Sequence, residues 1–183
     1  MRKLRRLGPD CRGAAAVEMA LVTPLLLTIL FGSVELGNYF MDEHTLVAGV
    51  RDGARWAARQ NFSQYNGCTG TAADVPTPGV SGTVNANTKL IVRKGTLNAA
   101  AGDLLPNWND GNTTFTVTMT CITTAGGVTM SGIYGGNSVG TSGVAPAVTV
   151  TAHLPYLPVL RSFGWSGVGS SLNASQQAAV AGI

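Results

Sequence analysis

Three consecutive residues, Asp42, Glu43 and His44, have the side-chain types that metal sites and acid–base catalysis use. Side chains that share one face of a helix are three or four residues apart, so three neighbours point in different directions. This spacing favours a solvated stretch of helix over a metal or catalytic cluster. The chain has one other histidine, His153.

The cysteines, glycines and lysines also lack the spacings of catalytic and cofactor motifs. Cys68 and Cys121 are too far apart for the C-x-x-C pattern of zinc and redox sites. No glycine-rich run precedes Lys-Ser or Lys-Thr, as a phosphate-binding loop requires, and the glycines at 164–171 lack a strand-turn-helix context. We therefore expect no enzyme activity, no metal or other cofactor, and no small-molecule substrate.

A long apolar run begins beside Gly13 and contains one acid, Glu18, near its start. At ~1.5 Å rise per residue, a helix over Ala14–Leu36 spans the ~30 Å hydrocarbon core of a membrane. A carboxylate at mid-depth costs ~2.5–3.5 kcal/mol, so Glu18 needs a partner. Apolar residues continue at three- and four-residue steps to about Gln60, which predicts one long helix, half in lipid and half packed on a domain. Pro24 should kink or loosen it, because proline removes a backbone hydrogen bond.

Positive charge is concentrated in the first 13 residues. It comes from five side chains: Arg2, Lys3, Arg5, Arg6 and Arg12. The charges of the remaining chain nearly cancel, so the net charge of +3 gives no support for nucleic-acid binding. Basic segments beside a span stay in the cytoplasm. We therefore expect a cytoplasmic N-terminus, one span of the inner membrane, and a periplasmic domain after it.

The order of these features resembles the N-terminus of TadE-like pseudopilins of the bacterial Tad (Flp) pilus system. The resemblance is carried by the basic leader, Gly13, Ala14, Glu18 as the fifth residue after the glycine, the apolar helix with Pro24, and the exit residues Gly32, Glu35, Leu36 and Gly37. It is strongest over Arg12–Arg59, weaker at 90–97 and faint at the C-terminus. Met19 stands where Flp pilins usually have tyrosine, and the chain is much longer than a major subunit, which favours a minor pseudopilin.

The resemblance implies a structural protein that is required for the initiation, base or tip of an adhesive Tad/Flp pilus. It implies that a prepilin peptidase cuts between Gly13 and Ala14. The other implied partners are Tad pilins and pseudopilins and the inner-membrane assembly platform. Glu18, one helical turn after Ala14, would pair with the new amine or with that of a neighbouring subunit. Whether the protein enters the surface pilus or acts only in its assembly stays open.

The serious alternative is an uncleaved signal anchor that carries a binding or adhesion domain. A cleaved secretory signal fits less well, because the apolar run is too long and no small-x-small site follows it.

The cysteines agree with the expected topology. Cys11 lies in the leader, on the reducing side, whereas Cys68 and Cys121 lie in the exported part, where disulfides persist. A Cys68–Cys121 bridge would close a loop of roughly 54 residues and contribute about 4 kcal/mol. The alternative is two buried free thiols.

The expected fold is α+β and pilin-like, with a long N-terminal transmembrane helix packed on a small antiparallel sheet. We divide the chain into a leader (1–13), a helix (14–61, with the span at about 14–36) and an extracytoplasmic domain (62–183). Within the domain we expect a loop over 61–87, a helix over 88–105, and strands over 114–123, 128–134 and 144–154. The segment 172–180 is a strand or a short helix, and the resemblance favours the strand.

Overall fold

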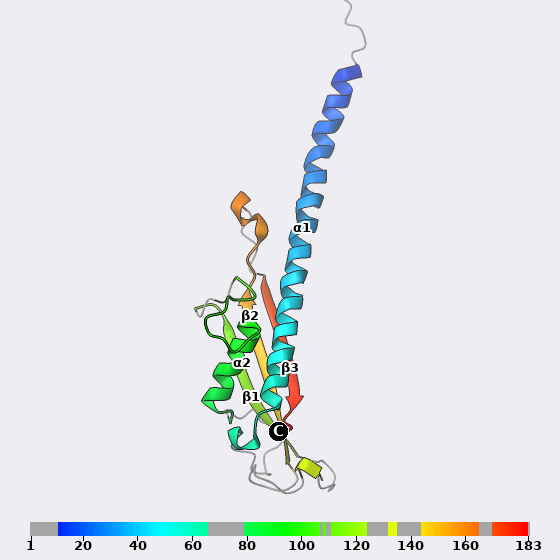
Figure 1. Ribbon diagram of the computed structural model, residues 1–183. Coiled ribbons are helices and arrows are strands. Elements are labelled where there is room, and N and C mark those ends of the chain that lie inside the picture. The colour runs from blue at the N-terminus through cyan, green and yellow to red at the C-terminus, as the bar shows by residue number, and fades with distance from the viewer. Residues whose placement is uncertain are drawn as a thin grey trace, which may run out of the picture.

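The computed structural model describes residues 11–65, 79–106, 108, 111–123, 132–134, 144–164 and 170–182. One long helix rises out of a small domain, and its N-terminal half extends beyond the sheet, as Figure 1 shows. The described part of the chain has the expected α+β, pilin-like architecture, in which a three-stranded antiparallel sheet packs against the lower half of the helix.

The long helix α1 spans Cys11–Ala58 without a break, close to the expected bounds. It is continuous through Pro24, so the proline does not interrupt it. At its end the Arg59 amide donates to the Trp56 carbonyl at 3.2 Å, which tightens the last turn. The C-terminal segment then fastens this end, because the Ala181 amide donates to the Ala58 carbonyl at 2.7 Å.

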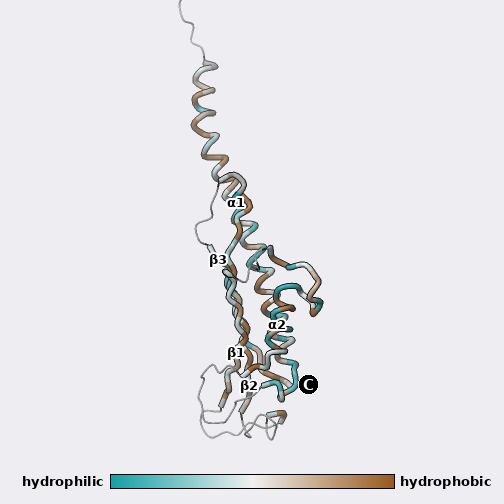
Figure 2. Tube along the Cα trace, turned by 90° about the vertical axis from the view of Figure 1, so that its left-hand side faces the viewer, coloured by the Kyte–Doolittle hydropathy of each residue, from teal (hydrophilic) through white to brown (hydrophobic). Residues whose placement is uncertain are grey.

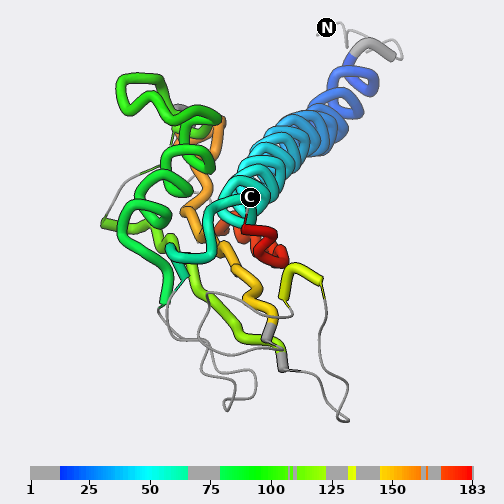
Figure 3. The backbone as a smooth tube through the Cα atoms, turned by 60° about the horizontal axis from the view of Figure 1, so that its bottom comes forward, coloured from blue at the N-terminus to red at the C-terminus, as the bar shows by residue number. Residues whose placement is uncertain are grey.

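The sheet contains β1 (Thr114–Thr123), β2 (Val144–Pro155) and β3 (Ser171–Ala179) in that order, and both pairs are antiparallel. On β1, threonines alternate with apolar side chains, and the apolar face packs into the core as expected. The register pairs Val117 with Val150 and Ala152 with Ala174, all of which are buried. Both helices lie on this face of the sheet, as Figure 3 shows.

The second helix, α2, spans Gly82–Lys94 and corrects two expectations. The segment 61–87 is not all loop, because the Ser81 side chain accepts a hydrogen bond from the Val84 amide and caps a helix that starts six residues earlier than expected. The helix also stops short of residue 105. Gly95 ends it with φ of 69°, a left-handed conformation that glycine adopts without strain.

Close contact between α1 and α2 depends on two glycines of α1. A Cβ atom on Gly49 would lie 2.8 Å from the Val92 carbonyl oxygen, and one on Gly53 would lie 2.5 Å from Val92 Cγ2. Any larger side chain at these positions would push the helices apart.

The remaining strand expectations have different outcomes. The strand over 114–123 is confirmed with the same bounds, 144–154 is confirmed and extends to Pro155, and 172–180 is a strand rather than a helix. The expected strand over 128–134 is wrong at its end, where Gly132–Tyr134 form the short 3-10 helix η2; residues 128–131 lie outside the described residues.

Candidate membrane anchor and assembly helix

The N-terminal half of α1 is an apolar rod that is largely exposed to solvent. Every side chain from Gly13 to Val34 is exposed. Figure 2 shows how hydrophobic this part of the tube is. It is long and apolar enough to cross a membrane, and none of its most apolar stretch is buried by the domain. Exposed apolar surface on this scale needs lipid or other helices around it, so this half of α1 is a membrane anchor.

Polar side chains in this rod are satisfied within the helix. The hydroxyl groups of Thr23, Thr28 and Ser33 donate to backbone carbonyls three or four residues earlier, at 2.6–2.8 Å. Such bonds remove the cost of leaving a hydroxyl unpaired in hydrocarbon.

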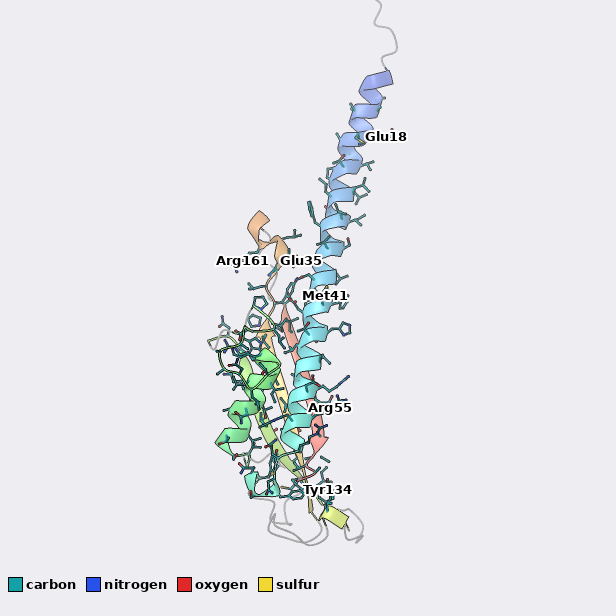
Figure 4. All side chains as sticks on the ribbon, viewed as in Figure 1. Glu18, Glu35, Met41, Arg55, Tyr134 and Arg161 are labelled. Atoms are coloured by element: carbon teal, nitrogen blue, oxygen red, sulfur yellow. The ribbon has the colours of Figure 1, made fainter. Side chains whose placement is uncertain are left out.

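Glu18 is different, because it has no hydrogen bond or ion pair within the described part of the chain. Its side chain is exposed on α1, one turn after Ala14, and Figure 4 shows it near the free end of the helix, far from the domain. The structure therefore places Gly13, Ala14 and Glu18 on one accessible stretch of helix. A carboxylate in an apolar helix needs a partner, and none lies among the described residues.

Glu35 forms the other acidic position of the apolar helix, and its partners come from the far end of the sequence. The Tyr156 hydroxyl donates to Glu35 Oε1 at 2.8 Å, and the Leu160 amide donates to Glu35 Oε2 at 3.2 Å. Asn38 Nδ2 in turn donates to the Tyr156 hydroxyl at 3.1 Å. Both carboxylate oxygens are thus hydrogen-bonded where the helix meets the domain.

Two tyrosine rings complete this junction. Tyr39 and Tyr156 pack edge to face with centroids 5.1 Å apart, and the Tyr39 hydroxyl donates to the Ser171 carbonyl at 3.2 Å. Burial raises the pKa of the Tyr156 hydroxyl, so it stays protonated and can donate to Glu35. A shallow, largely apolar hollow of about 360 Å³ lies here, lined by Gly32, Glu35, Leu36, Tyr39, Tyr156 and Ser170.

Only a weak signal for this junction is present in the amino-acid sequence. Glu35 belongs to the exit residues of the expected span. A carboxylate in the last turn of an apolar helix predicts that a partner exists. Nothing local predicts that the partner is Tyr156.

The Asp42–Glu43–His44 stretch does not form a metal site, because no cluster of three metal-ligating side chains occurs in the described residues. His44 is exposed, as a solvated helix predicts. The expectation is wrong for Glu43, whose Oε2 atom is buried with no hydrogen-bond partner among the described residues. Partial burial also raises the pKa of Asp42 above its usual range.

The two cysteines that follow the long helix, Cys68 and Cys121, differ in what the structure describes. Cys121 is buried in β1 and is disulfide-bonded. Cys68 lies outside the described residues, so its pairing with Cys121 stays a prediction.

Comparison with known families bears on the long helix. Residues 13–55 match the family model described as TadE-like protein. This segment is TadE-like. The match begins at Gly13 and ends inside α1, so it covers the apolar rod, Glu18, Glu35 and most of the domain-packed half.

The TadE-like match agrees with the family that the sequence resembles. It suggests a role in Tad pilus assembly. No curated protein and no solved structure matches the chain.

Proposed function

We propose that this protein is a minor pseudopilin that acts in the assembly of an adhesive Tad/Flp pilus, at its initiation, base or tip. The observation that carries the proposal is the coincidence of the TadE-like match with the exposed apolar rod. The match starts at Gly13, one residue before Ala14, and the apolar side chains of the rod that follows are exposed as far as Val34.

In this proposal a prepilin peptidase cuts between Gly13 and Ala14. The basic leader stays on the cytoplasmic side, and the domain lies in the periplasm. Before assembly, the processed helix is held in the inner membrane, where the assembly platform and other Tad pilins and pseudopilins are its partners.

Cleavage would supply the partner that Glu18 lacks. The new amine at Ala14 is cationic and lies one helical turn from the carboxylate. In low dielectric, an opposite charge within ~4–6 Å favours the ionised carboxylate. Glu18 would bind its own amine or that of a neighbouring subunit, and an intersubunit pair would set the axial register of the helices.

The cleavage step is tested by the mass of the protein extracted from membranes of a strain with the Tad system. The expected mature chain lacks the first 13 residues, and Gly13→Leu should remain at full length. Gly32→Leu is the matched control, because Gly32 is also a helical glycine with open space around its Cβ position. An intact N-terminus in the wild-type chain would contradict the proposal and favour an uncleaved signal anchor with a binding or adhesion domain.

The role of Glu18 is tested separately by Glu18→Gln, which keeps the shape of the side chain and removes its charge. We expect normal membrane insertion and cleavage but failure to co-purify with pilus components. Wild-type piliation in that strain would reduce Glu18 to a positional marker of the cleavage site.

A further inference from the structure

The chain after β2 returns to the level at which α1 leaves its apolar span. The short 3-10 helix η3 spans Val159–Phe163, and Figure 1 shows it reaching upward beside α1, beyond the end of the sheet. The Leu160 amide bonds to the Glu35 carboxylate, and Glu35 lies one residue before Leu36, the last residue of the expected span. A membrane that accepts Ala14–Leu36 therefore has its surface at η3.

The exposed side chains of this segment suit a membrane surface. Val159 is 50% exposed and Arg161 is exposed, whereas Leu160 is buried against the protein. Figure 4 places Arg161 near the level of Glu35. Tyr39 and Tyr156 lie at the same junction, and tyrosine is enriched where a protein meets the headgroups.

The charge distribution also favours contact between this segment and a membrane surface. From residue 111 to the end of the sequence, Arg161 is the only Asp, Glu, Lys or Arg. An isolated cation at the level of the headgroups faces lipid phosphates, and basic residues near anionic lipid are attracted to it.

We propose that residues 156–161, called here the interfacial segment, form a second membrane contact that lies on the anionic headgroups of the bilayer spanned by α1. Val159 offers apolar surface to the acyl boundary, and Arg161 binds lipid phosphate. The bonds from Tyr156 and Leu160 to Glu35 hold the segment at this depth. The domain is thereby seated directly on the membrane. This inference rests on the span and on the Glu35 junction, and not on cleavage or pilus assembly.

The test uses the full chain, reconstituted in phosphatidylethanolamine–phosphatidylglycerol vesicles at a low protein-to-lipid ratio. A polarity-sensitive fluorophore is attached at Val159→Cys, in a Cys11→Ser background. Ile133→Cys is the matched control, because Ile133 is also an exposed apolar residue (56%) in a short 3-10 helix. It lies at the opposite end of the domain, where Figure 4 labels its neighbour Tyr134.

The probe at 159 should show blue-shifted emission and strong quenching by lipids brominated near the headgroup, whereas the probe at 133 should be quenched only by aqueous iodide. Adding Arg161→Glu should reverse the blue shift, and Arg161→Gln should reverse part of it. Equal iodide quenching at 159 and 133 would overturn the proposal. So would protection of 159 that appears only at high protein density, because another subunit would then cover the segment.

Discussion

Glu35 and Tyr156 are 121 residues apart in the sequence, and their side chains meet at 2.8 Å where the apolar helix joins the domain. The contact fixes the angle and height of the domain relative to the membrane anchor. Because both carboxylate oxygens of Glu35 and the hydroxyl of Tyr156 are hydrogen-bonded, removal of one member leaves its partner unsatisfied.

Tyr156→Phe should therefore destabilise the domain by about 2 kcal/mol, since it removes a hydrogen bond to a charged group. Thermal unfolding of the purified protein, followed by near-ultraviolet circular dichroism, measures the loss. Tyr39→Phe is the control and should cost about 1 kcal/mol, because its hydroxyl bonds only to the neutral Ser171 carbonyl. In a double-mutant cycle of Tyr156→Phe with Glu35→Gln, the two losses of unfolding free energy should be coupled. Additive losses would argue against the contact.

Gly49→Ala should destabilise the domain by about 1–3 kcal/mol, because the new methyl group meets the backbone of Val92 and cannot be relieved by a side-chain rotation. Gly37→Ala is the matched control on the same helix. It has open space at its Cβ position, and alanine favours a helix over glycine by about 1 kcal/mol. Chemical denaturation measures the free energy of unfolding of both variants. If both substitutions stabilise the protein equally, the close α1–α2 approach is wrong.

Cys121→Ser should lower the thermal midpoint and cost about 2–4 kcal/mol, as removal of a disulfide from a small domain does. If Cys68 is the partner, Cys68→Ser should give the same loss and the double variant no further loss. Thiol labelling under denaturing conditions without reductant checks the pairing. Reactive thiols at both Cys68 and Cys121 in the wild-type chain would refute it.

Acid should weaken the contact between α2 and the loop after it. Arg93 donates to both Asp103 oxygens at 2.6 and 2.7 Å, and Lys94 lies 3.2 Å away, which holds the pKa of Asp103 below its usual range. A lowered folded-state pKa means that the stabilisation is fully present above the unfolded value of about 3.9 and is lost as the pH falls through the folded value.

For this surface pair the effect is at most about 1 kcal/mol. Asp103→Asn should therefore destabilise the protein at pH 7 but not at pH 2, as measured by urea unfolding. Asp52→Asn should change little at either pH, because its pair with Arg55 is 3.7 Å long and well exposed. A loss of equal size at both pH values would show that the charge of Asp103 is not the cause.

Local patterns were enough to predict the long helix, its apolar half, strand β1 and the TadE-like character of the N-terminal segment. Each depends on periodicity or order within a few tens of residues, which the chain displays directly. The bounds of α2 are also encoded locally, because Ser81 and Gly95 are ordinary helix-capping residues.

Only the tertiary structure decided which side chains meet. No local pattern shows that Gly49 and Gly53 lie against Val92, or that Glu35 bonds to Tyr156 and Leu160. Hydrophobic periodicity tells which face of an element is buried, but not which element covers it. That choice depends on chain closure over long distances, where many pairings bury similar apolar area and the specific polar contacts distinguish among them.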